Sequence, residues 1–266
     1  MMKLNGDIKI GAVLLWCIVA LSLAGMVWIP YEYNAMEASA RFLPPGPAHL
    51  LGTDNFGRDV FSRIMAGGKY TLLVAVCTVA GSAAIGAVLG LVTGYAGGVW
   101  DEAVMRLMDA LNAFPGILLA LVMVSLLDNG EGTLILALVA LFIPSFTRLM
   151  RNGMLEYKSR DFVKAVELLG LPRRRIIFLH IMPSLAPSFL SAVALGLSNA
   201  VLAEAALSYL GLGIQPPLPS WGRMLSESQN FLFNAPWCAL APGLMITLTV
   251  LAFHALGEGI RRRYCS

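Results

Sequence analysis

The sequence predicts an all-α integral membrane protein with six transmembrane helices. Hydrophobic residues occupy 58% of the 266 positions, and only 13% of the positions are charged. A water-soluble domain of this length could not bury so much apolar surface. Six stretches are apolar over about 20 residues, the length at which a helix crosses roughly 30 Å of hydrocarbon. We place these spans at residues 10–29, 70–94, 104–127, 133–150, 184–206 and 236–260.

Basic residues predict the orientation of the spans, because lysine and arginine are retained on the cytoplasmic side. With the N-terminus inside, the outer segments hold five of the 19 basic residues, Arg41, Arg58, Arg63, Lys69 and Arg223. The other 14 fall in inner segments, so we expect both termini in the cytoplasm. This topology accounts for the net charge of +3, which therefore gives no indication of nucleic-acid binding.

The first span has a second interpretation as a cleaved signal peptide. Lys3 and Lys9 precede it, and Ser22 to Ala24 offer small residues at a cleavage site. The apolar run continues to Ile29, however, so we expect this segment to stay as a membrane helix.

Residues that carry metal or catalytic chemistry are scattered. The four cysteines lack C-x-x-C spacing, the three histidines stand far apart, and the chain contains no H-E-x-x-H, G-x-S-x-G or Walker phosphate-loop motif. We therefore expect no catalytic residue, no metal site and no cofactor bound by this chain.

Small residues recur every four positions in the second span. Gly86, Gly90 and Gly94 lie in this register, and Ser82 and Gly98 extend it. One helical face is then almost free of side chains, which allows a second helix to approach closely. The partner is either another helix of this chain or a helix of a second subunit.

Charged residues inside the spans need partners or a role. Arg106 and Asp109, three positions apart, predict an ion pair at the inner start of the third span. Glu204 lies about 20 residues beyond Ser184, so we expect it at the outer membrane interface. The alternative is a place on a transport pathway.

The inner segment from Arg151 to Pro183 predicts two short amphipathic helices. Ser159 is positioned to cap the first, in which Phe162, Val166 and Leu169 recur at helical spacing. Gly170 and Pro172 end that helix and start the second. Such helices lie either on the membrane surface or in a groove on a soluble partner.

The same segment resembles the "EAA" loop of bacterial ABC importer permeases. The matching residues are Lys164, Ala165 and Val166, then Gly170, and finally His180 to Pro183. Three further stretches, residues 50–72, 202–225 and 236–261, are similar to the second permease subunit of the dipeptide, oligopeptide and nickel transporter family. Lys164 replaces the usual glutamate of the loop, Val166 an alanine and Met182 a leucine. The reversed charge at Lys164 suggests a compensating acidic residue on the partner.

This resemblance implies a type I importer permease fold in the bacterial inner membrane. It divides the chain into residues 1–69, with the first helix and an extracytoplasmic segment, a permease core at 70–260 and a short cytoplasmic tail at 261–266. It implies a homologous permease as heterodimer partner, two ATPase subunits that bind ATP and Mg²⁺, and an extracytoplasmic solute-binding protein. The loop is then the coupling helix, with the residues Phe162, Lys164, Ala165, Val166, Glu167, Gly170, Leu171, Arg173, Ile181 and Pro183.

Two outer segments, Tyr31 to Lys69 and Ser208 to Ala235, are rich in Pro, Gly and aromatic residues. We expect them to meet the binding protein, with Trp221 and Glu204 as contact or gate residues. An ordered turn around Trp221 that packs on the bundle is the alternative. The motifs do not separate peptides from nickel or other metal chelates as substrates. An ion-coupled secondary transporter is a second functional class, although the sequence shows neither clear midplane charges nor clear internal repeats. A membrane-anchored scaffold is a third.

Overall fold

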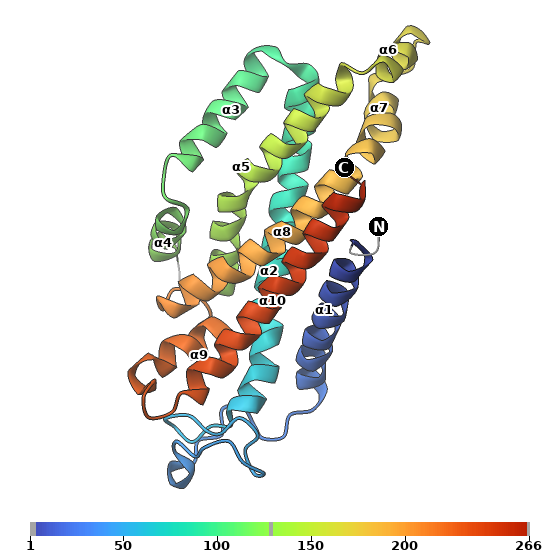
Figure 1. Cartoon of the computed structure of the whole chain (residues 1–266). Coiled ribbons are helices and arrows are strands. Elements are labelled where there is room, and N and C mark those ends of the chain that lie inside the picture. The colour runs from blue at the N-terminus through green and yellow to red at the C-terminus, as the bar shows by residue number, and fades with distance from the viewer. Residues whose placement is uncertain (1–3, 128–129, 265–266) are drawn as a thin grey trace.

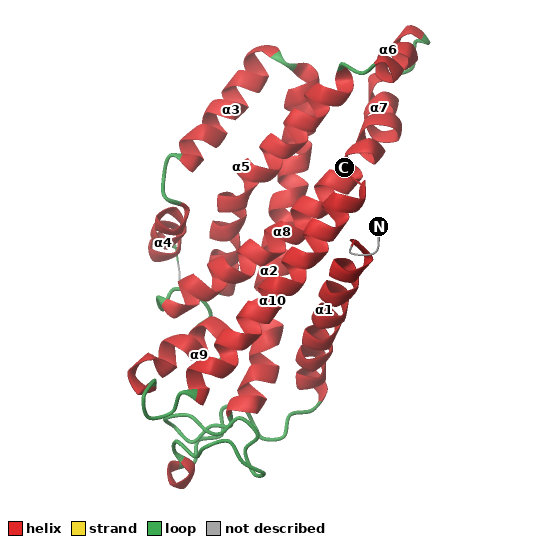
Figure 2. Ribbon diagram, viewed as in Figure 1, coloured by secondary structure: helices red, strands yellow, loops and turns green. Residues whose placement is uncertain are grey.

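The computed structural model describes residues 4–127 and 130–264. Figures 1 and 2 show an elongated bundle of helices, and the described ranges contain no β-strand, only one isolated bridge between Thr53 and Asp59. The long helices are α1 (Leu4–Val27), α2 (Val60–Ala96), α5 (Glu131–Lys158), α8 (Met182–Tyr209) and α10 (Trp237–Tyr264). The short ones are η1 (Ala38–Ala40), α3 (Gly98–Asn112), α4 (Gly116–Leu126), α6 (Asp161–Leu168), α7 (Arg173–Ile176), η2 (Ile177–Ile181), α9 (Trp221–Ser228) and η3 (Gln229–Phe231).

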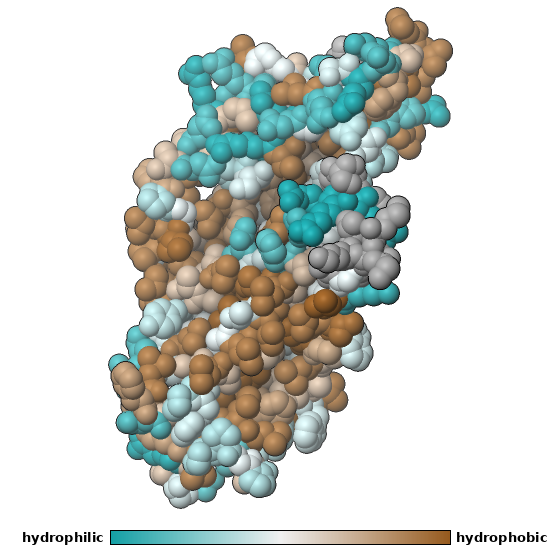
Figure 3. All heavy atoms as spheres, viewed as in Figure 1, coloured by the Kyte–Doolittle hydropathy of each residue, from teal (hydrophilic) through white to brown (hydrophobic). Residues whose placement is uncertain are grey.

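Within the described ranges, five helices are long and apolar enough to cross a membrane, and the number is six if the bent pair α3 and α4 counts as one span. The all-α membrane fold is therefore confirmed. The space-filling view shows apolar side chains over much of the middle of the face in view (Figure 3). Polar side chains gather at the end that carries α3, α6 and α7, which we call the α6 end. The opposite end, with α9 and the 28–59 segment, is the α9 end.

The third predicted span is not one straight helix. α3 and α4 meet at an angle of 86° across a break at 113–115. Pro115 lacks a backbone N–H and disfavours helical geometry at the residue before it, so the helix ends there. The predicted pair within α3 is also wrong: Arg106 bonds Glu102 at 2.5 Å, and Asp109 bonds Arg148 of α5 at 2.7 Å.

The second span begins ten residues earlier than the sequence predicted. α2 starts at Val60, where the Asp59 carboxylate accepts a hydrogen bond from the Ser62 backbone N–H at 2.7 Å. This N-cap satisfies one of the free donors at the helix start. α2 is 37 residues long, so residues 60–69 belong to a rigid helix and not to an outer loop.

The glycine face of α2 packs against α5 within the same chain. A Cβ atom added at Gly86 would lie 2.6 Å from Phe146 Cβ, and one at Gly94 would lie 2.9 Å from the Arg151 carbonyl oxygen. Gly90 faces the Thr147 carbonyl oxygen even more closely. The intrachain alternative is therefore correct for these three glycines. Gly98 does not share the contact, because a Cβ atom there meets nothing within 4 Å.

The second helix of the inner segment is continuous with the fifth span. α7 passes through the π-helical turn η2 directly into α8, which begins at Met182. Pro183 has no N–H and its ring would clash with the carbonyl four residues earlier, which a π-turn relieves by widening the helix. The Met182 N–H accordingly donates to the Ile177 carbonyl, five residues back.

Candidate functional site

α6 and the turn that follows it project past the bundle at the α6 end (Figure 1). Val163 is fully buried against α5, α7 and η2, and Val166 packs beside it. The opposite side is apolar and open: Phe162 is 43% exposed, Leu168 89% and Leu169 77%. The helix and the turn after it therefore present three exposed large apolar side chains, of which Phe162 also meets the Tyr157 ring edge-on, and such surfaces mark interaction sites.

The start of α6 differs from the prediction. Ser159 does not cap this helix: it ends α5, and its hydroxyl donates to the Glu156 carbonyl at 2.7 Å. The Arg160 carbonyl accepts the first backbone hydrogen bonds of α6, from Val163 and Lys164. Phe162 and Leu169, which the sequence grouped with Val166 at helical spacing, are exposed, whereas Val166 packs toward the bundle. Lys164 is also exposed, and its ammonium group lies 3.4 Å from the Asp161 carboxylate.

The turn between α6 and α7 rests on Gly170, whose φ of +72° lies in the left-handed region. Only glycine adopts this conformation without strain. Pro172 then starts α7, and its carbonyl accepts hydrogen bonds from Arg175 and Ile176. The predicted roles of both residues in ending and starting the helices are therefore confirmed.

The base of the loop is anchored in a buried cluster. Ile176 and Ile181 are almost fully buried with Met154 and Leu185, and Leu171 packs against them. Pro183 lies at the first turn of α8, and Ala165 is exposed on α6. The side chains of Glu167 and Arg173 lie outside the described part of the structure. Buried side chains therefore hold the base of the loop rigidly against the bundle.

A cleft of about 370 Å³ lies between α5 and α8, close to this loop. Its lining is mixed, with Asn152, Glu156 and Ser184 beside Leu149 and Phe189. Polar side chains are uncommon on helices of an apolar bundle unless they line a cavity or meet one another. The cleft is therefore a candidate for part of a solute path.

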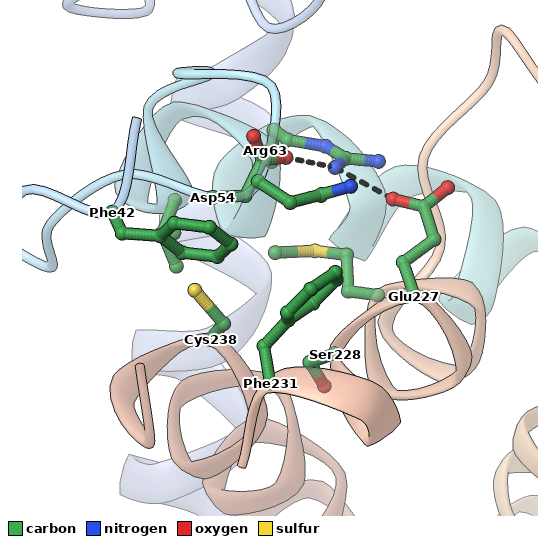
Figure 4. Close-up of a pocket in the computed structure, with 10 residues that line it drawn as sticks. Phe42, Asp54, Arg63, Glu227, Ser228, Phe231 and Cys238 are labelled. Carbon is green, nitrogen blue, oxygen red and sulfur yellow. Dashed lines mark hydrogen bonds and ion pairs between the residues drawn. The ribbon is translucent and has the colours of Figure 1, made fainter. Parts of the chain in front are cut away.

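The α9 end holds a buried cluster of charges that the sequence analysis did not find. Arg58 Nε lies 2.6 Å from Asp54 Oδ2, and Arg58 Nη2 lies 2.7 Å from Glu227 Oε2. Arg63 Nη1 bridges the same two carboxylates at 2.7 and 2.8 Å. Figure 4 shows Arg63 between Asp54 and Glu227, which come from the outer loop and from α9. We call Asp54, Arg58, Arg63 and Glu227 the charge cluster.

The arginines determine the ionisation of Glu227. Partial burial alone would raise the pKa of its carboxyl group, but Arg63, Arg58 and Arg223 outweigh burial and lower the pKa below its usual range. Glu227 is therefore a carboxylate at neutral pH. It ties α9 to the start of α2.

Trp221 does not lie on the surface. Its side chain is fully buried, and its indole N–H donates to the Ile64 carbonyl at 3.0 Å. The expectation that this side chain contacts a partner directly is therefore wrong, and the alternative of an ordered turn packed on the bundle is correct. The sequence indicated a stiff turn, but not that it folds back between α2 and α8.

Glu204 is fully buried within the protein as well. It lies on α8, and its Oε1 accepts a hydrogen bond from the Ser208 hydroxyl at 2.6 Å. The described residues form no cluster of three or more His, Cys, Asp or Glu side chains that could hold a metal ion.

A membrane bundle with a broken span and a projecting apolar loop defines a class of protein, the membrane-embedded subunits of solute transporters. The chain belongs to the family described as "binding-protein-dependent transport system inner membrane component", whose profile matches residues 86–264. It is an ABC importer permease of the peptide family.

Relatives match almost the whole chain. A dipeptide transport system permease protein, DppC of Alkalihalophilus pseudofirmus, is 38% identical over 98% of this chain and 86% of its own length. DppC of Haemophilus influenzae is 37% identical over 97% of this chain and 90% of its own length. A glutathione transport system permease protein, GsiD of Pectobacterium atrosepticum, is 37% identical over 92% and 81% of the two chains.

A solved structure supports the fold. A chain of the inward-facing MetNI methionine ABC transporter superposes with a TM-score of 0.61, covering 74% of this chain and 94% of that chain. At 18% sequence identity, this likeness shows the type I permease fold and nothing more specific. Membership of the family excludes the ion-coupled secondary transporter as the function of this chain.

Proposed function

We propose that this chain forms half of the transmembrane path of an ATP-driven importer for short peptides. The relatives at 37–38% identity are named as dipeptide and glutathione permeases, and all of these named solutes are peptides. None of these three names mentions nickel, so a peptide is the better supported substrate. The cleft between α5 and α8 then contributes to the path, with a homologous but different permease supplying the other half.

The observation that carries this proposal is the loop from α6 to α7. It exposes Phe162, Leu168 and Leu169 on a rigid base, which suits a helix that seats in a groove of a soluble subunit. The occupied groove belongs to one of two cytoplasmic ATPases, which bind ATP and Mg²⁺. Closure of the ATPases moves the loop, and the rigid base transmits this movement to α5 and α8.

The orientation of the bundle in the membrane follows from the assignment of the loop to a cytoplasmic ATPase. The α6 end, where basic residues gather, lies in the cytoplasm together with both termini. The α9 end then faces outward and receives the loaded solute-binding protein. Its exposed apolar side chains include Tyr31, Met36, Phe56 and Phe233, which are suited to an interface.

Reconstitution tests the proposal directly. Liposomes that contain this chain, its sister permease and the two ATPases should import a labelled dipeptide when ATP is inside and the binding protein is outside. Liposomes that lack the ATPases, or that hold a nonhydrolysable ATP analogue, are the controls. Import driven by an ion gradient without ATP would contradict the proposal, and so would ATP-driven import of free nickel but of no peptide.

A further inference from the structure

A buried carboxyl group on α8 meets three hydroxyl groups that come from three different parts of the chain. The Ser208 hydroxyl donates to Glu204 Oε1 at 2.6 Å. Thr71 of α2 and Ser220, which precedes α9, place their hydroxyl groups against the same carboxyl group. Oε2 itself makes no hydrogen bond of acceptable geometry. A carboxyl group without water is stable only where such donors replace it.

The three hydroxyl groups share a second feature. Each accepts a hydrogen bond from a backbone N–H of the chain between α8 and α9 or of α9 itself: Ile214 to Ser208 at 3.2 Å, Trp221 to Thr71 at 3.3 Å, and Arg223 to Ser220 at 3.1 Å. A hydroxyl that accepts from one backbone group keeps its own proton for another acceptor. Ser208 gives its proton to Glu204 Oε1, and the Thr71 and Ser220 hydroxyl groups lie beside the same carboxyl group.

Close backbone contacts hold the same segment against α8. A Cβ atom at Gly222 would lie 2.6 Å from Ala205 Cα, and one at Gly213 would collide with the Ser208 hydroxyl. The segment 210–228, which we call the folded-back segment, therefore rests directly on the α8 backbone. Its position depends on the network around Glu204 at one end and on the charge cluster at the other.

We propose that Glu204 is a positioning residue for transport, which fastens the folded-back segment to α2 and α8 so that these three parts move as one body when the outer end opens and closes. The inference rests on the proposed function, and it specifies which part of the chain moves together with α8. Without the carboxyl group, the Ser208 hydroxyl loses its acceptor, and the Thr71 and Ser220 hydroxyl groups lose the polar group beside them. α9 then lags behind α8, and ATP hydrolysis proceeds with less import.

The first test separates hydrogen bonding from volume. Glu204→Met keeps a side chain of similar size without hydrogen-bonding groups, whereas Glu204→Gln keeps one acceptor and gains a donor. In reconstituted transporter, Glu204→Met should lower the dipeptide imported per ATP about tenfold, as expected for the loss of one or two buried hydrogen bonds. Glu204→Gln should stay within about threefold of the native ratio, because its amide can still bond the hydroxyl groups. A Glu204→Met transporter with the native ratio would overturn the proposal.

The second test measures the movement itself. Spin labels at Lys69 of α2 and at Asn230 of η3, both exposed, report the distance between α2 and the end of the folded-back segment, which η3 directly follows. This distance should be the same in the nucleotide-free and ATP-bound states of the native protein and of Glu204→Gln. In Glu204→Met it should broaden or change between the states. A native protein in which the distance changes with ATP would refute movement as one body.

Two further variants cover the case in which Glu204→Met does not assemble. Thr71→Val removes one hydroxyl group at constant volume and should lower the import ratio about threefold, as for a single buried hydrogen bond. Its control is Ser198→Ala on α8, whose hydroxyl donates to the Val250 carbonyl at 3.1 Å outside the network, and which should leave the ratio unchanged. An unaltered ratio in Thr71→Val would overturn the inference. Absence of ATP-driven dipeptide import by the native transporter would instead contradict the proposed function.

Discussion

Arg63 and Glu227, 164 positions apart in the chain, are joined by an ion pair of 2.8 Å in which the arginine side chain is only 4% exposed. Arg63 Nη1 also bonds Asp54, so one nitrogen holds the outer loop, α2 and α9 together. Removing one partner of a buried pair leaves the other charge without compensation, which costs more than the pair itself contributes.

Arg63→Met should therefore destabilise the subunit by roughly 3 kcal/mol, measured as a lower thermal unfolding temperature in detergent. The double variant Arg63→Met/Glu227→Met should lose less than the sum of the two single changes, because neither charge is left alone. Arg41→Met is the matched control, since this outer arginine is exposed and should have little effect. Strict additivity would show that the two residues do not interact.

The same cluster predicts a pH dependence of stability. The pKa of Glu227 is lower in the folded protein than its usual value, so its ion pairs contribute fully above the unfolded pKa of about 4.3. This contribution is lost as the pH falls through the lower folded pKa. The difference in unfolding temperature between native protein and Glu227→Gln should be constant from pH 8 to 6 and should shrink below about pH 4.3. A difference that grows on acidification would refute the assignment.

We expect substitutions at Gly170 to impair the coupling of ATP hydrolysis to transport without impairing membrane insertion. A side chain there meets nothing within 4 Å in this chain, but the φ of +72° strains any residue with a Cβ atom. Gly170→Val should suffer most, because β-branched residues avoid this region, whereas Gly170→Asn should be mild. We expect Gly170→Val to insert normally and to lose the stimulation of ATP hydrolysis by the loaded binding protein. Normal stimulation in Gly170→Val would argue against the loop as the coupling element.

Gly90 predicts a defect in folding instead. Even the single methyl group of Gly90→Ala would be forced against the Thr147 carbonyl of α5, and such overpacking costs about 1–3 kcal/mol. Yield and thermal stability should both fall. Ala84→Leu, an enlargement at an exposed position of the same helix, is the control and should be tolerated in the isolated subunit.

Orientation is tested by labelling single cysteines in a background without the four native ones. Lys158→Cys should react only with a membrane-permeant reagent, and Asn230→Cys should react from outside with an impermeant one. Both residues lie at ends of the bundle. Asn230 is exposed, and Lys158→Cys removes the hydrogen bond that Lys158 Nζ donates to the Tyr95 carbonyl at 2.7 Å. The reverse pattern would invert the assignment of the two ends.

Local features of the fold were predictable from sequence, and distant pairings were not. The four-residue spacing of Gly86, Gly90 and Gly94 and the turn at Gly170 are short-range patterns, so both were found. The ion pair of Arg63 with Glu227 leaves no local signal, because its partners stand in segments that are separated by most of the chain. The burial of Glu204 was not predicted, because counting residues along a span cannot show that a later segment folds back over its end.

The break between α3 and α4 shows another limit. Hydropathy averaged over a window treats residues 104–127 as one span, although Pro115 and the charges of α3 already indicate an interruption. The sequence predicted the apolar spacing of α6, but not which of these side chains would be buried. On an eight-residue helix, spacing alone does not decide which side faces the bundle.

The length of α2 has a mechanical consequence. A helix of 37 residues measures about 55 Å, whereas the hydrocarbon layer is roughly 30 Å thick, and an ordinary tilt of about 20° absorbs only a small part of the excess. Because α5 packs closely along the glycine face of α2, the two helices form one stiff unit that extends beyond the lipid. Force applied at the α6–α7 loop, which follows α5, therefore tilts α2 and α5 together. A small displacement at the loop then becomes a displacement of both helices at the opposite end.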